Sequence, residues 1–144
     1  MKLSIVIGSR NQKPVLEKTL RSLLAQEPPK HPDDSYEIIV VDSRSTDGTG
    51  ELLMELHATH DHLRYFIQDN RGRTGARNRG IREAGGNIIL FTDADMIADP
   101  RLIREHLDFH HRFSGSASGR TWNLRSSDLP VDDARKLSEF GAQY

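Results

Sequence analysis

The sequence predicts an α/β fold built on a mostly parallel sheet with crossover helices. Short runs with the composition of strands alternate with segments of helical periodicity along most of the 144 residues, which is typical of such folds. Residues 38–41 and 88–91 are continuous apolar runs rich in branched side chains, as expected of strands that are covered on both faces. We therefore expect both runs to be central strands.

Clear signals of four strands and a first helix occur within residues 3–92. Strands are expected at residues 3–7, 37–41, 63–68 and 87–92. The first helix is expected over residues 15–25, because leucines recur there at helical spacing behind Pro14 and a proline fits the first turn of a helix. Residues 27–35 hold three of the six prolines and no apolar periodicity, so they are expected to form a surface loop.

Three further helices follow from caps and periodicity. Thr46 or Asp47 is placed to cap the second helix. The third is expected over residues 75–84, with its small residues toward the sheet. Asp99 and Pro100 are a cap followed by a residue suited to the first helical position, so they are expected to open the fourth helix. Its inner stripe is expected to hold Leu102, Ile103, His106 and Leu107.

After residue 113 the pattern loosens. A fifth strand over residues 115–124 and a short helix over residues 131–140 are the weaker expectations there. No internal repeat, heptad array or low-complexity tract occurs.

Composition excludes several classes of protein. The 20 Lys and Arg residues are balanced by 21 Asp and Glu, for a formal net charge of -1, so nucleic acid is not expected as a partner. The absence of cysteine excludes a disulfide framework, a thiolate zinc site and a cysteine nucleophile. The opening apolar run is far shorter than the roughly 20 residues of a membrane helix, so we expect no integral membrane segment and a cytoplasmic location.

Polar clusters follow each of the expected strands. They are residues 8–11, 42–47, 69–73 and 93–95. Ligands of parallel sheets bind in the crevice outside the carboxyl ends of the strands. The sequence therefore predicts that these four clusters meet and form a site.

The last cluster, Asp93-Ala94-Asp95, is the most informative. On an extended stretch two residues that are two apart point to the same side, so the two carboxylates would face one ligand. Mg²⁺ and Mn²⁺ are commonly held by one or two carboxylates together with substrate phosphates. A turn with helix-capping acids is the alternative.

Arginines and histidines form two further groups. The arginines near the third helix are Arg71, Arg73, Arg77, Arg79 and Arg82. Like charges near a positive helix end repel unless an anion is present, and a diphosphate would serve; Arg79 and Arg82 fit a solvated face better. The spacing of His106, His110 and His111 does not match a zinc motif, so we expect histidines on helix surfaces.

Ordered groups of residues resemble one known family. They are Ser4-Ile5-Val6-Ile7; Glu37-Ile38-Ile39-Val40-Val41-Asp42 with Ser45-Thr46-Asp47-Gly48-Thr49; Asn70-x-Gly72 with Ala76-Arg77-Asn78-x-Gly80-Ile81; and Gly86-Asn87-Ile88-Ile89-Leu90-Phe91-Thr92-Asp93-Ala94-Asp95 followed by Pro100. In this order they resemble the inverting, nucleotide-sugar-dependent family-two glycosyltransferases of the GT-A fold. The resemblance covers about residues 3–111.

The resemblance implies a GT-A fold, a Rossmann-like three-layer sandwich that is incomplete at its C-terminal side. Residues 1–144 would form one nucleotide-sugar-binding domain, with a core at 3–111 and the start of an acceptor-side region at 112–144. The implied reaction transfers a glycosyl group from a nucleoside-diphosphate sugar to the hydroxyl of an unidentified acceptor. In relatives the catalytic base lies well downstream of the Asp-x-Asp pair. We assign it to none of the late acids, Asp128, Asp132, Asp133 and Glu139.

The resemblance also implies roles for individual residues. Asp95 with Asp93 would bind Mn²⁺ or Mg²⁺ that bridges the diphosphate, and Asp93 would lie near the ribose. Arg77 would approach the base or the diphosphate. The remaining donor-site candidates are Ser9, Arg10, Asn11, Asp42, Ser43, Arg71 and Ala94.

Two departures from the family pattern leave the donor open. Gly8-Ser9-Arg10-Asn11 stands where the family often has Pro-x-Tyr-Asn, so an aromatic platform for the base is missing. Ser43 stands where the family frequently has a second acid, which puts recognition of uridine in question.

Two other interpretations compete with a transferase. A non-catalytic half-domain would pair through its uncovered sheet edge, and its partner would be a second copy of the chain in a homodimer. A phosphohydrolase of the haloacid-dehalogenase type would need its acids after the first strand, whereas here they follow the fourth. A P-loop ATPase is excluded because the sequence has no G-x-x-x-x-G-K-[ST].

Overall fold

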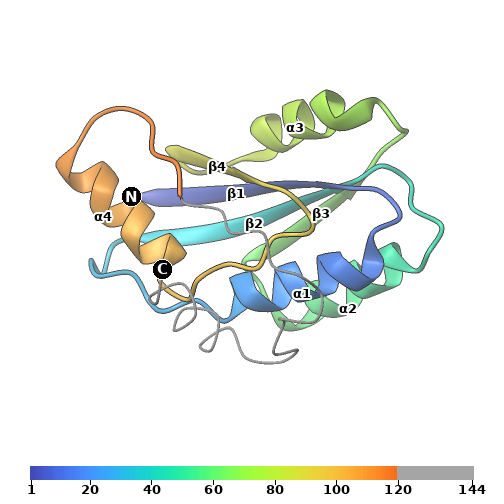
Figure 1. Cartoon of the computed structure of the whole chain (residues 1–144), viewed down its shortest axis with the longest axis horizontal. Helices are drawn as coiled ribbons and strands as arrows, with labels where there is room; N and C mark the ends of the chain where they lie inside the picture. Colours follow the sequence, from blue (N-terminus) through green and yellow to red (C-terminus); the bar gives the residue numbers. More distant parts are fainter. Residues whose placement is uncertain (120–144) are drawn as a thin grey trace.

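The computed structural model describes residues 1–119, which form four strands and four helices. The strands are β1 (Lys2–Ser9), β2 (Ser35–Asp42), β3 (Leu63–Ile67) and β4 (Ile88–Thr92). The helices are α1 (Lys13–Leu24), α2 (Thr49–Thr59), α3 (Gly72–Glu83) and α4 (Leu102–Arg112). Helices lie on both sides of one sheet, so the predicted three-layer α/β architecture is confirmed (Figure 1).

The sheet has the strand order β3-β2-β1-β4, and every neighbouring pair is parallel. Ile5 of β1 lies opposite Ile38 of β2 and Leu90 of β4, which fixes the register. Strands β1 and β2 occupy the centre, as the apolar run at 38–41 predicted for β2. All four strands end at the same edge of the sheet, because they run in one direction.

The prediction that residues 88–91 form a central strand is wrong for residues 1–119. In that part of the chain β4 pairs with β1 alone. Its Ile88 and Leu90 pack against the main core, while Phe91 on the other face is 42% exposed. A strand that pairs on one side and packs one face against the core already buries enough side chains to require apolar residues. A local apolar run therefore does not reveal a strand's place in the order.

One face of the sheet is covered by α1, α2 and α4. Leucines of α1 and α2 pack with Ile103 and Leu107 of α4 against the alternate side chains of β1 and β2. The helical spacing of Leu16, Leu20 and Leu23 predicted this buried stripe, and all three are 0–1% exposed. This layer holds most of the hydrophobic core.

The opposite face is covered by α3, and the contact is close. Ala76 and Gly80 are the buried residues of this helix. A Cβ built on Gly80 would lie 2.2 Å from Cγ1 of Val6, so only glycine permits this approach. The prediction of small residues toward the sheet is confirmed at both positions, whereas Ile81 is 43% exposed.

Two helices begin later than their caps predicted. The N-cap of α2 is Gly48, with φ 87°, and Asp47 accepts hydrogen bonds from the Thr49 amide and hydroxyl at 3.2 and 2.6 Å. A turn at Pro100 precedes α4, because the Leu102 amide donates to the Asp99 carbonyl at 3.0 Å.

Residues 115–119 are not a strand. The rest of the strand predicted over residues 115–124 and the helix predicted over residues 131–140 lie outside the described residues.

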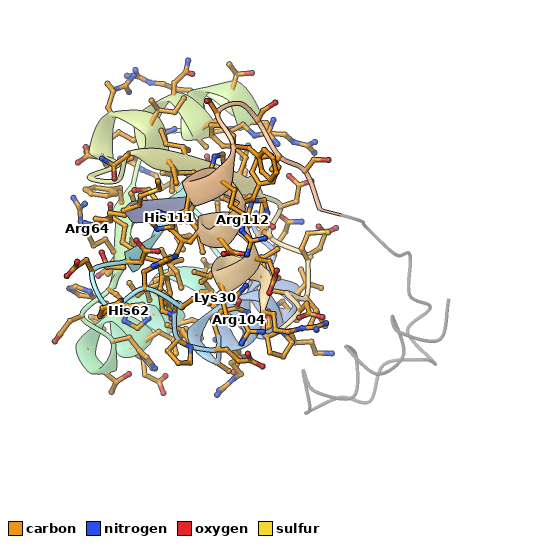
Figure 2. The ribbon with its side chains drawn as sticks, turned by 90° about the vertical axis from the view of Figure 1, so that its left-hand side faces the viewer. Lys30, His62, Arg64, Arg104, His111 and Arg112 are labelled. Carbon is orange, nitrogen blue, oxygen red and sulfur yellow. The ribbon has the colours of Figure 1, made fainter. Side chains whose placement is uncertain are left out.

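The predicted loop after α1 is confirmed, and ion pairs tie α4 to it. They join Lys30 to Asp108 and Arg104 to Glu27, at 2.9 and 2.5 Å, and a hydrogen bond of 2.8 Å joins the His111 ring to Asp34. Figure 2 shows Lys30, Arg104, His111 and Arg112 together around this helix. Burial opposes ionisation of Asp34, but hydrogen bonds from the N-terminal ammonium and His111 outweigh it and lower its pKa.

A buried carboxylate organises the amino-terminal edge of the sheet. Glu37 of β2 is 4% exposed. Its Oε1 accepts hydrogen bonds from the Ser4 hydroxyl at 2.8 Å and the Gly85 amide at 2.7 Å. Its Oε2 pairs with Arg64 at 3.2 Å and Lys2 at 3.3 Å. One side chain thus joins β1, β2, β3 and the turn between α3 and β4.

The Glu37 network predicts a pH-dependent contribution to stability. Burial raises the pKa of Glu37, but its hydrogen bonds and cationic partners lower the pKa by a larger amount. The net result is a pKa below 4.5. The stabilisation is complete above the pKa of an unfolded glutamate and is lost as pH falls through the folded-state pKa. We expect Glu37→Gln to lower the free energy of unfolding at pH 7 by about 2 kcal/mol, with the difference shrinking as pH falls below 4.5.

Urea unfolding at a series of pH values measures this difference. Glu55→Gln is the matched control, because Glu55 is exposed on α2. A Glu37→Gln deficit that persisted unchanged at acidic pH would show that the lost stability does not come from the ionised carboxylate.

Candidate functional site

The four polar clusters predicted from the sequence meet at the carboxyl-terminal edge of the sheet. Ser9 lies opposite Asp42 in the strand register, and the Ser43 amide donates to the Ser9 carbonyl at 2.9 Å. The Gln68 amide donates to the Asp42 carbonyl at 2.9 Å, which extends the edge to the end of β3. On the other side Thr92 lies opposite Ile7, so the Asp-x-Asp segment emerges beside the end of β1.

The loops after β1 and β2 are joined by Asn11. This residue has φ 50°, a left-handed conformation that asparagine tolerates better than most residues. Its amide donates to the Ser45 hydroxyl, and its side-chain oxygen accepts from the Thr46 amide, both at 2.8 Å. The two loops therefore form one connected wall of the site.

Asp47 adds a second link between these loops. Hydrogen bonds from the Thr49 hydroxyl and the Lys13 amide lower the pKa of its carboxyl group. Asp47 therefore connects the loop after β1 to the start of α2 and has a structural role.

Asp42 and its neighbours are buried at the base of this wall. Asp42 is 1% exposed, and its two carboxylate oxygens accept from the Ser45 amide at 2.9 Å and the Ser45 hydroxyl at 2.5 Å. Ser43 is 5% exposed. Each carboxylate oxygen can accept a further hydrogen bond, so this engagement leaves Asp42 able to contact a ligand.

Ser9 carries an unpartnered polar atom at the same level. The residue is 4% exposed, and its hydroxyl has no hydrogen-bond partner among the described residues. A buried polar group without a partner is unfavourable, so a ligand or water at this edge would satisfy it. Arg10, the next residue, is exposed.

The Asp93-Ala94-Asp95 segment projects two carboxylates outward. β4 ends at Thr92 and a turn follows at residues 94–95, so the expected extended geometry is replaced by a bend. Ala94 is 3% exposed and packs in the main core, whereas both flanking aspartates are exposed. Burial of the middle residue thus turns both acids toward solvent.

The two carboxylates have different surroundings. Asp93 accepts a long hydrogen bond from Arg77 at 3.5 Å, whereas Asp95 makes no hydrogen bond or ion pair within residues 1–119. Carboxylate oxygens suit Mg²⁺ and Mn²⁺. The described residues contain no group of three His, Asp or Glu arranged to hold a metal ion, so an ion at this pair would need ligands from elsewhere.

Arginines supply positive charge beside these acids. The Arg77 guanidinium also lies 5.6 Å from the ring centre of Phe91, a cation–π contact. Arg71 lies at the N-terminal end of α3. Arg10, Arg71 and Arg73 are exposed and form no ion pair with any residue from 1 to 119. The site edge therefore has unpaired cations that would attract an anion.

The other arginines of α3 have structural partners or point away. Arg79 pairs with Glu83 at 2.7 Å and lies over the Phe66 ring at 5.1 Å. Arg82 is exposed near the far end of the helix. The expectation that these two belong to a solvated or locally paired face agrees with this placement.

Sequence reasoning missed the α1 side chains that hold the Asp-x-Asp loop. The Thr19 hydroxyl donates to the Ala94 carbonyl at 2.8 Å, and the Ser22 hydroxyl accepts from the Ala98 amide at 3.0 Å. Both side chains lie on the buried face of α1, among its leucines. Polar residues inside an apolar stripe were the signal that could have found them.

The histidines do not form a metal site in the described residues. The inner-stripe position expected for His106 on the fourth helix is confirmed, since this residue is 8% exposed, and the general expectation of helix-surface histidines does not hold for it. Burial lowers its pKa, and the neighbouring His110 lowers it further. His106 lies one turn beyond Ile103 on the inner face of α4, so helical register carries it into the interior.

Known proteins share this sequence pattern. Residues 4–125 match the family model described as Glycosyl transferase family 2. An uncharacterized glycosyltransferase of Bacillus subtilis, YfnE, is 37% identical over 110 residues, which cover 76% of this chain and 27% of that protein.

Solved structures share the fold. The mannosyltransferase PcManGT from Pyrobaculum calidifontis, in complex with GDP-Man and Mn²⁺, is 31% identical with a TM-score of 0.61, over 71% of this chain and 30% of that chain. TarS 1-349 of S. aureus in complex with UDP-GlcNAc is 23% identical with a TM-score of 0.68, over 83% of this chain and 37% of that chain. At that identity the likeness to TarS shows the fold alone.

The chain spans less than a third of YfnE and of PcManGT. Among residues 1–119, no helix has the length and apolar character needed to cross a membrane.

The joined loop wall predicts graded effects of substitution at Asn11. Asn11→Ala removes the bond to Thr46 and places a residue that disfavours φ 50° at this position, so we expect it to lower the free energy of unfolding by about 2 kcal/mol. Asn11→Gly removes the bond but tolerates the backbone, so we expect a loss of about 1 kcal/mol. Chemical denaturation measures both. Equal losses, or a larger loss for glycine, would contradict the backbone argument.

Proposed function

The chain belongs to glycosyltransferase family 2, and on this premise we propose that it binds a nucleoside-diphosphate sugar through Mn²⁺ or Mg²⁺ for transfer of the glycosyl group to an acceptor hydroxyl. The observation that carries the proposal is the pair of exposed carboxylates, Asp93 and Asp95, held outward by the buried Ala94 beside unpaired arginines. Paired acids and cations at one edge suit a ligand that combines a metal ion with phosphates.

The donor set at the Asp-x-Asp segment fits a divalent ion. Asp95 has no competing partner within residues 1–119, so its carboxylate is available. Asp93 has only the long contact to Arg77 at 3.5 Å, and exposed ion pairs of this kind contribute little. Both carboxylates would hold the ion, which would supply positive charge for a diphosphate bound beside it. The 31% identical PcManGT, whose structure contains GDP-Man and Mn²⁺, supports this assignment.

The diphosphate is assigned to the arginines. Arg77 lies beside Asp93 and above Phe91, so it is held close to the metal ligands. Arg71 and Arg10 are exposed at the same edge, and the positive N-terminal end of α3 favours an anion there.

The nucleoside is assigned to the wall formed by the first two loops. Ser9, Asn11, Asp42 and Ser43 lie together there, and the Ser9 hydroxyl is unpartnered. A ribose or base provides donors and acceptors that would satisfy such groups. Ala94, which lies between Asp93 and Asp95, is the last residue assigned to the donor site.

The transfer requires three events at the sugar. An acceptor oxygen forms a bond to the anomeric carbon, the bond from that carbon to the diphosphate breaks, and a base removes the acceptor proton. The metal ion supplies Lewis acidity to the leaving diphosphate when it is bound. Arg77 and Arg71 would stabilise the charge that develops on the leaving group. We assign the base to no residue of this chain.

The base of the donor nucleotide is identified by comparing the binding of GDP with that of UDP. PcManGT contains GDP-Man, and Ser43 replaces the acid that the family frequently has at this position. The family match does not favour the non-catalytic half-domain as the alternative function. The homodimer and the cytoplasmic location expected from the sequence stay predictions.

Substitution at Asp95 tests the proposal directly. We expect GDP or UDP to bind tightly only when Mn²⁺ is present, and Asp95→Asn to weaken this metal-dependent binding by at least 10-fold, roughly the scale of losses at metal sites. Asp95 is exposed and unpaired among the described residues, so the variant should keep the wild-type circular dichroism spectrum and melting temperature. Isothermal titration calorimetry with and without Mn²⁺ measures the binding.

Asp33→Asn is the matched control, because Asp33 is exposed in the loop that follows α1. It should bind nucleotide like the wild type. Nucleotide binding of equal strength with and without Mn²⁺ would refute the metal-dependent site.

A further inference from the structure

A row of polar side chains on and just after α1 holds the segment that follows β4. Thr19 and Ser22 lie on α1, Gln26 follows its C-cap Ala25, and each bonds the backbone of residues 94–103. The Gln26 side chain donates to the Asp99 carbonyl at 2.8 Å and accepts from the Ile103 amide at 3.1 Å. The helix thus fixes this segment along its length, without using either aspartate of the Asp-x-Asp pair.

Thr19 is the member of the row nearest the acids. It is 1% exposed, and its hydroxyl lies 2.8 Å from the Ala94 carbonyl and 3.1 Å from the Val15 carbonyl of its own helix. A hydroxyl has one proton to donate, and the shorter contact is the one to Ala94. The Ala94 carbonyl is therefore bound to a buried donor on α1.

This bond constrains Asp95 through the backbone. The carbonyl of Ala94 and the amide of Asp95 belong to one planar peptide unit. Holding the Ala94 oxygen against α1 fixes the orientation of that plane and the position of the Asp95 Cα, from which the Asp95 side chain leaves the backbone. The Ala94 methyl group is buried in the core, so packing of this side chain holds Ala94 in place as well.

We propose that Thr19 is a positioning residue for the metal-binding pair, which orients Asp95 toward the ion by donating a hydrogen bond to the Ala94 carbonyl. The inference rests on the proposed function, since it assigns Thr19 a role in the site that function requires. Ser22 and Gln26 anchor the later part of the segment, at Ala98 and Asp99, and so lie farther from the ligand atoms. Thr19 is therefore the residue of the row whose loss should act on metal binding.

Thr19→Val and Thr19→Ser separate the hydroxyl from the shape of the side chain. Valine keeps the branched shape and lacks the hydroxyl, whereas serine keeps the hydroxyl. We expect Thr19→Val to weaken Mn²⁺-dependent binding of GDP or UDP by roughly 10-fold, the scale found for partners that orient metal ligands. Metal-free nucleotide binding should be unchanged, and Thr19→Ser should restore the metal-dependent affinity.

Two measurements report on the proposal. Calorimetry with and without Mn²⁺ gives the metal-dependent affinity, and hydrogen exchange of the ligand-free chain reports on the loop. Exchange at residues 95–98 should be faster in Thr19→Val than in the wild type or Thr19→Ser. Thr59→Val is the matched control, since Thr59 is exposed on α2 and its hydroxyl contacts the Leu56 carbonyl of its own helix at 3.2 Å and the neighbouring His60 ring at 2.9 Å. If Thr19→Val does not fold, Thr19→Ala replaces it in the same comparison.

The possible failures are distinguishable. Wild-type affinity in Thr19→Val, in the presence of Mn²⁺, would overturn the role of Thr19 while leaving the proposed function in place. Equal weakening with and without Mn²⁺, or a serine variant as weak as valine, would show a general structural role and would also overturn it. A wild-type chain without any Mn²⁺-dependent nucleotide binding would refute the proposed function and this inference together.

Discussion

Parallel alignment of the four strands is the constraint on which the rest of the structure depends. Because every strand runs in the same direction, every strand-to-helix loop emerges at one edge, and the register places Ser9 opposite Asp42 and Thr92 opposite Ile7. Residues that are far apart in the sequence thereby become neighbours. The loop residues then bond one another, as Asn11 does with Ser45 and Thr46. The site is thus a consequence of strand direction and register.

The two edges of the sheet differ in whether their most prominent carboxylate has partners. At the amino-terminal edge Glu37 is buried and fully engaged by Ser4, Gly85, Arg64 and Lys2, so its charge is compensated inside the fold. At the carboxyl-terminal edge Asp95 and several arginines are exposed without partners among residues 1–119. The buried charge at the amino-terminal edge is therefore compensated within the fold, whereas the exposed Asp95 stays available for the ligand proposed above.

The sequence predicted the strands, the three layers, the GT-A fold that solved relatives share and the meeting of the polar loops, because periodicity and strand direction are properties that short segments carry. It failed where a long-range choice decides the outcome. The apolar run of β4 could not reveal that, among the described residues, this strand pairs only with β1. Thr19 was missed because the significance of a hydroxyl in a leucine stripe depends on which loop packs against it.

A turn with capping acids was the alternative explanation of the Asp-x-Asp segment, and the structure contains genuine examples for comparison. Asp47 accepts from the Thr49 amide at the start of α2, and Asp99 accepts from the Arg101 amide just before α4, at 3.2 and 2.9 Å. Both acids use their oxygens on backbone donors in the turn that precedes a helix, whose N-cap residues are Gly48 and Arg101. Asp95 accepts no such bond within residues 1–119, and the turn that carries it is fixed by Thr19 through the Ala94 carbonyl instead. A carboxylate that is bonded to no group among residues 1–119 is open to a ligand, which agrees with the metal site proposed above rather than with a cap.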